Sequence, residues 1–252
     1  MKLIEPFFLF INLMESHEPY NWNDIASREL FFDSIAGNQH KATTKRWKEL
    51  YPLHATLAVN RCLDIIEKLK PILDESLVII TSDHGQLLGE GMKYHHGYFL
   101  DDVLIKVPLY VKFPRGTPNF KQTGDFVSLT EINSLVRSVI HGRPSKLGSE
   151  FVFAESFGIL VNCDNVFRSE RDKRLLELTK ARRIRIISHD GSVLYNVNTN
   201  QVEDHSGDGI SKDQIEKILR QMEGDSDIAN DDEFSKEESR EVQKRLKLLG
   251  YD

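Results

Sequence analysis

The chain has 252 residues, 40% of them hydrophobic, so it is long enough to bury a core as one large domain or two small ones. Its formal net charge of −6 excludes a general nucleic-acid binder, because binding to a phosphate backbone needs a basic face. Two cysteines cannot form a disulfide framework and no secretory signal follows Met1, so we expect a cytoplasmic protein. The apolar run at residues 7–14 is too short to span a bilayer, and we expect no membrane contact.

This apolar run, FFLFINLM, predicts an interior parallel strand that ends where residues 15–20 turn the chain away. His17 lies just past the strand, within reach of a site at its carboxyl end. An isolated histidine in such a place is more often a capping or surface residue. Residues 21–50 lack a clean period, and we interpret them as an excursion whose aromatic side chains, such as Trp47, anchor it to the core.

Apolar residues recur at helical spacing from Tyr51 to about Lys70, which predicts a crossover helix that Pro71 ends. The run from Leu77 to Ile80 is rich in β-branched residues and predicts a strand buried on both faces. Strand, helix and strand would complete a βαβ unit in a mostly parallel sheet.

The sequence SDHG directly after this second strand is the main candidate for chemistry. Ligands of open α/β sheets collect beyond the carboxyl ends of the strands, and Asp83 and His84 stand at that place. A carboxylate beside an imidazole suits a divalent metal or a phosphate-like ester, and Gly85 would let the backbone turn closely around it. A glycine-rich loop leads to a second polar cluster, which consists of Lys93, His95 and His96.

The rest of the chain predicts shorter elements. They are a strand over residues 107–113, a helix over 128–142 with Ser128 as N-cap and Glu131 in a capping box, a strand over 151–155 and a β-hairpin over about 181–204. We interpret His189, Asp190 and Gly191 as the turn of the hairpin rather than as a ligand set. Residues 225–233 predict a solvated linker, and Ser235 is the predicted N-cap of a final helix.

The order of these motifs resembles the sulfatase branch of the alkaline-phosphatase-like superfamily. TSDHG, GE, HHG, an acidic pair and VPLYVKF follow one another over residues 80–113, and SLTEI at 128–132 and RLKLLGYD at the end are similar too. The resemblance implies an α/β three-layer sandwich with a mostly parallel sheet, truncated at its N-terminus, plus a small C-terminal hairpin and helices. We expect a partial catalytic domain at residues 1–160 and a hairpin and helical subregion at 161–252.

The same resemblance implies roles for individual residues. Asp83 and His84 would be metal ligands, and His17 would contact the oxygens of a small anionic sulfate or phosphate ester. His96, with Lys93, would stabilise or protonate the leaving group. The implied metal is a divalent ion, Ca²⁺ first, with Mg²⁺, Mn²⁺ and Zn²⁺ as alternatives.

Two of these assignments keep an alternative. His96 is preferred to His95 because it immediately precedes Gly97 and stands at the family's spacing before VPLYVKF. For Lys93, a solvated loop lysine stays open.

Two segments that open full-length sulfatases have no counterpart here: a strand with two metal-binding acidic residues, and a nucleophile in a CxPSR-like sequence. Neither Cys62 nor Cys163 lies in such a motif. We therefore expect the C-terminal portion of a sulfuric ester hydrolase without its own nucleophile, and whether it is an enzyme by itself stays open. A missing N-terminal segment or self-association would cover the exposed face. The alternatives are a phosphodiesterase, phosphatase or phosphotransferase of the same superfamily, and a non-catalytic ligand-binding protein.

Overall fold

The computed structural model describes residues 7–18, 20, 40–117, 120–158, 180–207 and 210–228. The predictions for residues 21–39 and for the final helix from Ser235 fall outside these ranges. The helices are α2 (Lys41–Leu69), α3 (Asp102–Ile105), α4 (Glu131–Ile140) and α6 (Lys212–Ile228), with 3-10 turns η1 (Lys70–Glu75) and η2 (Glu90–Met92). The strands are β1 (Val78–Thr81), β2 (Leu87–Leu88), β3 (Tyr94–His95), β4 (Leu109–Lys112), β5 (Phe120–Gln122), β6 (Ser145–Leu147), β7 (Phe151–Ser156), β8 (Arg183–Ser188), β9 (Gly191–Asn196) and β10 (Gln201–Gly207).

The strands form small and mostly antiparallel sheets. β1 pairs with β4 and β2 with β3 in antiparallel fashion, and β10, β9, β8 and β7 form an antiparallel sheet in that order. Among the described residues β5–β6 is the one parallel pair, so the prediction of a mostly parallel sheet is wrong for them. The side chains of β4 alternate between partly buried and exposed, a pattern of one solvated face that antiparallel sheets tolerate. β1 is likewise only partly buried, not buried on both faces.

The apolar run at residues 7–14 is extended but forms no strand. Phe8 is 86% exposed and Phe10 is 78% exposed, so the predicted interior strand is wrong. A strand needs a neighbour to accept its backbone hydrogen bonds, and no described strand pairs with this run. The segment is fixed at its other end, where His54 Nδ1 of α2 lies 2.8 Å from the backbone oxygen of Glu15.

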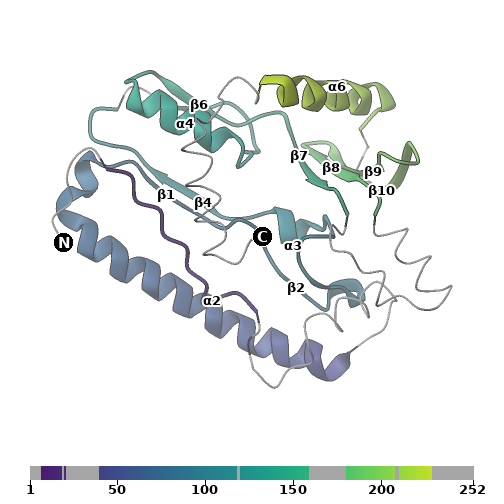
Figure 1. Cartoon of the computed structure of the whole chain (residues 1–252), viewed down its shortest axis with the longest axis horizontal. Coiled ribbons are helices and arrows are strands. Elements are labelled where there is room, and N and C mark those ends of the chain that lie inside the picture. Colours follow the sequence, from purple (N-terminus) through teal and green to yellow (C-terminus); the bar gives the residue numbers. More distant parts are fainter. Residues whose placement is uncertain are drawn as a thin grey trace, which may run out of the picture.

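Helix α2 confirms the predicted helix and begins ten residues before the expected start, but it does not cross over between parallel strands, so the predicted βαβ unit is wrong for the described residues. Its 29 residues span about 43 Å along one side of the molecule (Figure 1). Trp47 on its first half is 1% exposed and packs with Tyr20 and Tyr94, which confirms its structural interpretation. No helix in the described part of the chain combines the length and apolarity that a membrane span requires.

Helix α4 begins at Glu131 with Thr130, not the predicted Ser128, as its N-cap, and only the Glu131 half of the predicted capping box is formed. Glu131 Oε1 accepts a hydrogen bond from the backbone N–H of Ser128 at 2.9 Å. Its other oxygen accepts from the backbone N–H of Gly148 at 3.0 Å, so one carboxylate joins the start of α4 to the end of β6.

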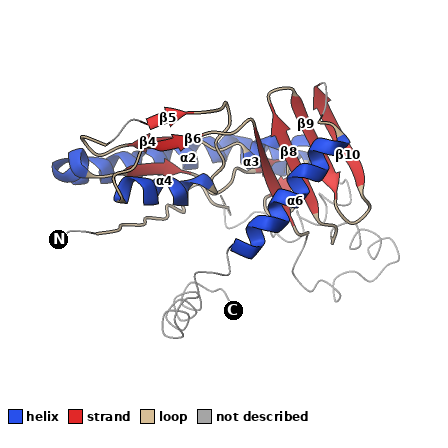
Figure 2. Ribbon diagram, turned by 90° about the horizontal axis from the view of Figure 1, so that it is seen from above, coloured by secondary structure: helices blue, strands red, loops and turns tan. Residues whose placement is uncertain are grey.

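The predicted hairpin is confirmed as β8 and β9, and the predicted strand at 151–155 as β7. The structure shows that β7 and β10 pair on either side of this hairpin. Helix α6 lies across one face of this sheet (Figure 2), where Ile215 and Ile218 share a core with Ile184 and Ile186 of β8. β7 precedes the predicted domain boundary at residue 160 and pairs with β8 beyond it. α6 continues to Ile228, so the predicted solvated linker is wrong for residues 225–228.

We expect Trp47→Ala to lower the free energy of unfolding by about 3–5 kcal/mol, because it empties the centre of the aromatic cluster. Urea unfolding measures the change. Leu53→Ala is the control, since Leu53 lies on the same helix but is 66% exposed, and should change stability by less than about 0.5 kcal/mol. Equal losses in the two variants would contradict the packing described for α2.

Candidate active site

The loop after β1 carries the Asp83–His84 pair and is fixed from behind by α3. The backbone N–H of Gly85 donates to the backbone oxygen of Leu104 at 2.8 Å. A Cβ atom at Gly85 would lie 1.9 Å from the backbone oxygen of Val103. Glycine is therefore required here by the close approach of α3, a reason different from the ligand contact that the sequence suggested.

A short hairpin, β2–β3, positions the second polar cluster. Leu87 pairs with His95 in its ladder, so the residues just outside this pair, Gln86 and His96, face each other. Gln86 Oε1 lies 3.0 Å from His96 Nδ1. The antiparallel register thus brings the residue after DHG (83–85) next to HHG (95–97).

Glu18 connects this hairpin to the N-terminal segment. Its Oε1 lies 2.5 Å from His95 Nδ1, and its Oε2 accepts a hydrogen bond from Gln86 Nε2 at 2.8 Å. The side chain of Glu18 is only 8% exposed, so both contacts are shielded from water. Neither Glu18 nor Gln86 was a candidate from sequence. Their adjacency to His17 and to the DHG segment was the available signal.

The imidazoles of His17, His84 and His96 gather beside the β2–β3 hairpin and are called the histidine cluster below. The rings of His84 and His96 are stacked, with centroids 4.0 Å apart and planes 21° apart. His17 meets His96 edge to face at 5.4 Å between centroids. Asp83 Oδ2 lies 3.7 Å from His84 Nε2. The structure therefore brings Asp83, His84, His17 and His96 together, and their chemical roles stay predictions.

Each of these three imidazoles has its Nδ1 atom near an oxygen, so Nδ1 carries the hydrogen and Nε2 the lone pair in the neutral ring. The carboxylate can only accept, so the Gln86 amide nitrogen faces Glu18 and its oxygen faces His96. Histidines that bind metals commonly donate from the second ring nitrogen in this way. The acceptors are the backbone oxygens of Glu18 for His17 (2.5 Å) and of Gly85 for His84 (2.7 Å), and Gln86 Oε1 for His96 (3.0 Å).

The surroundings of His96 disfavour its charged form. Burial lowers its pKa from 6.5 to about 4, with a further contribution from His84 that outweighs the opposing effect of Glu18. His96 is therefore neutral near pH 7. In this state it has no imidazolium proton to donate, which argues against the predicted role of a general acid and leaves that of a base, weakened by the same low pKa.

The other two residues of the second polar cluster, His95 and Lys93, make their contacts outside the histidine cluster. His95 is 5% exposed and packs against Trp47 as well as Glu18. Lys93 Nζ lies 2.8 and 2.9 Å from the two carboxylate oxygens of Asp101 and 5.2 Å from the ring centre of Phe99. Lys93 is thus a half-buried, ion-paired residue, not the solvated lysine of the alternative interpretation.

Asp83 and His84 fit a divalent metal in kind. The carboxylate and the Nε2 lone pair converge, and the other nitrogen of His84 is held by a backbone oxygen, as in many metal sites. They do not complete a site, because no group of three or more His, Cys, Asp or Glu among the described residues is arranged to hold a metal ion. Hard cations such as Ca²⁺ need six or more ligands, so further ligands would have to come from outside these residues or from substrate and water.

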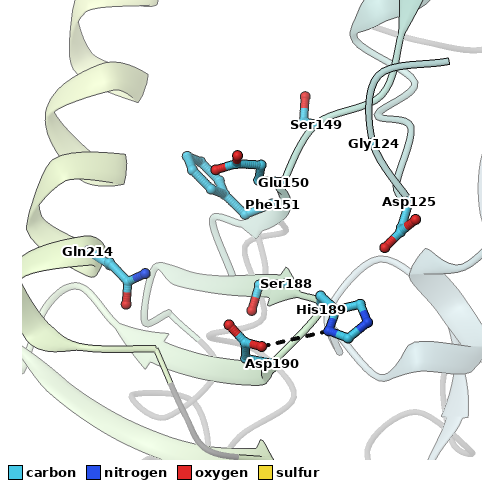
Figure 3. Close-up of a pocket in the computed structure, with 9 residues that line it drawn as sticks. All are labelled: Gly124, Asp125, Ser149, Glu150, Phe151, Ser188, His189, Asp190 and Gln214. Carbon is cyan, nitrogen blue, oxygen red and sulfur yellow. Dashed lines mark ion pairs between the residues drawn. The ribbon is translucent and has the colours of Figure 1, made fainter.

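A hollow of about 410 Å³ lies away from the imidazoles, between the β8–β9 turn, the start of β7 and α6 (Figure 3). Asp125, Glu150 and Asp190 line it, and His189 pairs with Asp190 at 3.6 Å. Carboxylates would repel an anionic ester, so the hollow does not compete with the histidine cluster for that substrate. The turn position of His189 and Asp190 agrees with the structural interpretation given to them.

Comparison with known proteins defines the class. The family model described as Sulfatase matches residues 2–140, more than half of the chain, and this range contains every residue of the histidine cluster. The chain therefore belongs to the sulfatase family, whose fold is alkaline-phosphatase-like α/β. A search of curated proteins found no match.

The lowered pKa of His96 predicts a pH dependence of stability. Between about pH 6.5 and pH 4 the unfolded chain binds a proton at this position that the folded chain does not, so stability falls as pH falls through this window. His96→Gln should remove part of that slope, because Gln does not titrate. Urea unfolding at several pH values measures it.

His189→Gln is the matched control, since the side chain of His189 is 83% exposed on a turn. It should leave the slope as in the wild-type chain. A slope that is the same for His96→Gln and the wild type would show that His96 is not kept neutral by the fold.

Proposed function

We propose that this chain carries the metal-binding and ester-binding residues of a sulfatase-type site that hydrolyses sulfate esters. The observation that carries the proposal is the convergence of Asp83, His84, His17 and His96 on one place beyond β1. These four residues come from three separate segments of the chain, and all lie in the part that matches the sulfatase family. Chance packing of polar loops would not be expected to gather three imidazoles, two of them stacked, beside one carboxylate.

Each residue has a role in the proposed site. Asp83 and His84 hold a divalent metal, which when bound would neutralise the ester oxygens as charge develops on them. His17 contacts the ester and His96 transfers a proton, entering the reaction as a neutral base. Lys93 is paired with Asp101, which offsets its charge, so we give it no direct part in stabilising the leaving group.

Hydrolysis by this route also needs a nucleophile, and residues 1–252 contain no CxPSR-like sequence. We propose that the nucleophile comes from outside these residues. In this proposal the chain is the C-terminal portion of a sulfatase-type hydrolase and supplies only part of the complete site. The same observation favours a second candidate, a ligand-binding protein of the sulfatase family that does not hydrolyse its ligand. The geometry leaves sulfate and phosphate esters as equal candidates, because both are tetrahedral anions.

Calorimetric titration of the full chain with Ca²⁺, Mn²⁺ and Zn²⁺ tests the metal assignment. We expect binding to the wild-type chain and at least a tenfold weaker affinity for Asp83→Ala, because the substitution removes the charged ligand. Asp190→Ala removes a carboxylate of similar exposure from the hollow and should bind like the wild type. Equal binding by Asp83→Ala and the wild type would exclude Asp83 as a ligand.

Turnover and binding of model esters then separate the remaining candidates. A sulfatase portion, given its missing segment in trans, hydrolyses an aryl sulfate, and a phosphoryl-transfer relative hydrolyses the matching aryl phosphate. Saturable binding of either ester with no turnover supports the ligand-binding candidate. Absence of both binding and turnover would contradict the proposed function.

A further inference from the structure

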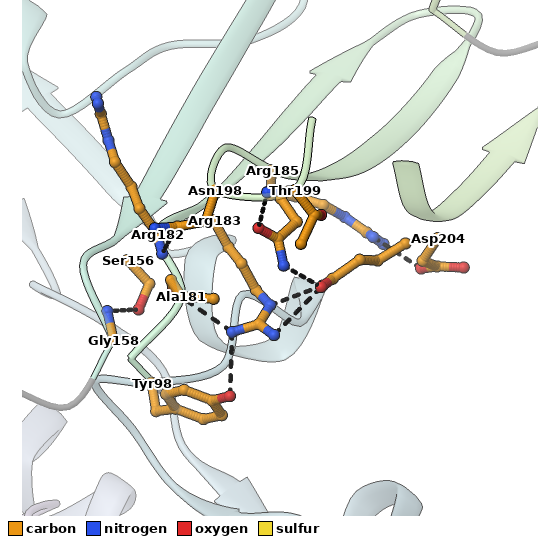
Figure 4. A network of polar contacts seen from close by, with 12 residues as sticks. Tyr98, Ser156, Gly158, Ala181, Arg182, Arg183, Arg185, Asn198, Thr199 and Asp204 are labelled. Carbon is orange, nitrogen blue, oxygen red and sulfur yellow. Dashed lines mark hydrogen bonds and ion pairs between the residues drawn. The ribbon is translucent and has the colours of Figure 1, made fainter. Parts of the chain in front are cut away.

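The loop that carries His96 is attached through Tyr98 to the four-stranded sheet β7–β10, called the C-terminal sheet below. Arg183 Nη1 of β8 donates a hydrogen bond to the Tyr98 hydroxyl at 3.1 Å, and its guanidinium lies 5.7 Å from the centre of the Tyr98 ring. Both contacts join segments 85 residues apart in the chain. Figure 4 shows Arg183 reaching from the sheet toward Tyr98.

Arg183 is itself held rigidly. Its Nε and Nη2 donate to the two carboxylate oxygens of Glu203 at 2.6 and 3.2 Å, a bidentate pair with little freedom to rotate. Asn196 Nδ2 donates to the same carboxylate at 2.7 Å. The register of β9 and β10 shifts between Val202 and Asp204, and this bulge places Glu203 where it can reach β8.

Only Gly97 separates Tyr98 from His96. Gly97 has a φ of +89°, a conformation that few other residues adopt, and a glycine restrains the backbone less than a residue with a Cβ atom does. A loop that contains such a glycine depends on contacts with other parts of the chain to hold one conformation. On the other side of Tyr98, Phe99 packs edge to face against its ring at 4.8 Å and lies under Lys93 Nζ.

We propose that Arg183 is a positioning residue, which fixes the loop of residues 96–99 through Tyr98 and so sets the orientation of the His96 imidazole. The C-terminal sheet lies beyond residues 2–140, so a part of the chain outside the family match takes part in building the site. That this positioning serves ester chemistry rests on the proposed function, whereas the coupling itself does not.

Arg185 offers a matched control on the same strand. It lies two residues from Arg183, has the same 12% side-chain exposure and also pairs with a carboxylate of β10, Asp204, at 2.8 Å. Figure 4 shows it turned toward Asp204 and away from Tyr98. A general effect of losing an arginine from β8 would therefore appear in both positions.

The test is nitrogen-15 NMR of the full chain with labelled histidine at one fixed pH, with His96 assigned from His96→Gln. In the wild-type chain the two ring nitrogens of His96 should be well separated in chemical shift, since Nδ1–H is held by Gln86. Tyr98→Phe removes only the hydroxyl. Arg183→Lys keeps the positive charge but removes the guanidinium that binds Glu203 and Tyr98 together. In both variants the difference in chemical shift between Nδ1 and Nε2 of His96 should become smaller, because the ring samples both tautomers. Arg185→Lys should give the wild-type difference.

Wild-type His96 signals in Tyr98→Phe and Arg183→Lys would overturn the proposal, and so would equal changes in Arg183→Lys and Arg185→Lys. Circular dichroism checks folding. If Arg183→Lys does not fold, the comparison of Tyr98→Phe with the wild type decides alone. Altered His96 signals in a chain that binds neither metal nor ester would leave the coupling standing and reject the proposed function, so the two failures are distinguishable.

Discussion

The site depends on one buried carboxylate. Glu18 is held between His95 and Gln86, and both contacts cross between segments that are more than 60 residues apart in sequence. Because a carboxylate only accepts hydrogen bonds, it fixes which end of the Gln86 amide turns toward His96. The Gln86 oxygen is thereby available to the Nδ1–H of His96, whose ring also stacks on that of His84.

Three further contacts support the same loops. The aromatic cluster around Trp47 holds Tyr94 and His95 against α2, and α3 receives the backbone at Gly85. The contact of Arg183 with Tyr98 ties the other end of the second loop to the C-terminal sheet. The polar residues of the candidate site are therefore carried by short, irregular segments, whose positions are set by larger elements packed around them.

The sequence predicted elements better than their assembly. The sequence correctly predicted the α2 helix, the hairpin of β8 and β9 and the Glu131 half of the capping box, because they depend on local periodicity, turn residues and caps. The prediction for residues 7–14 failed because an apolar run becomes a strand only when a neighbour is present to pair with it. The mostly parallel sheet failed for a related reason, since strand direction depends on which strands meet and not on the composition of any one of them.

The same division holds for the site. Asp83, His84, His17 and His96 were recognisable because a family motif places them at fixed positions in the sequence. Glu18 and Gln86 were not, because nothing local indicates that a carboxylate at residue 18 will meet an amide at residue 86. Arg183 was equally hidden, since its strand looked like an ordinary hairpin and the bulge that brings Glu203 to it cannot be inferred from periodicity.

The most direct test of the account is an anomalous-scattering map of crystals of the full chain soaked with Mn²⁺ and inorganic sulfate. The account predicts a metal peak between the Asp83 carboxylate and His84 Nε2, with sulfate density beside His17. A metal peak in the hollow of Asp125, Glu150 and Asp190, with Asp83 and His84 empty in the same crystal, would contradict it.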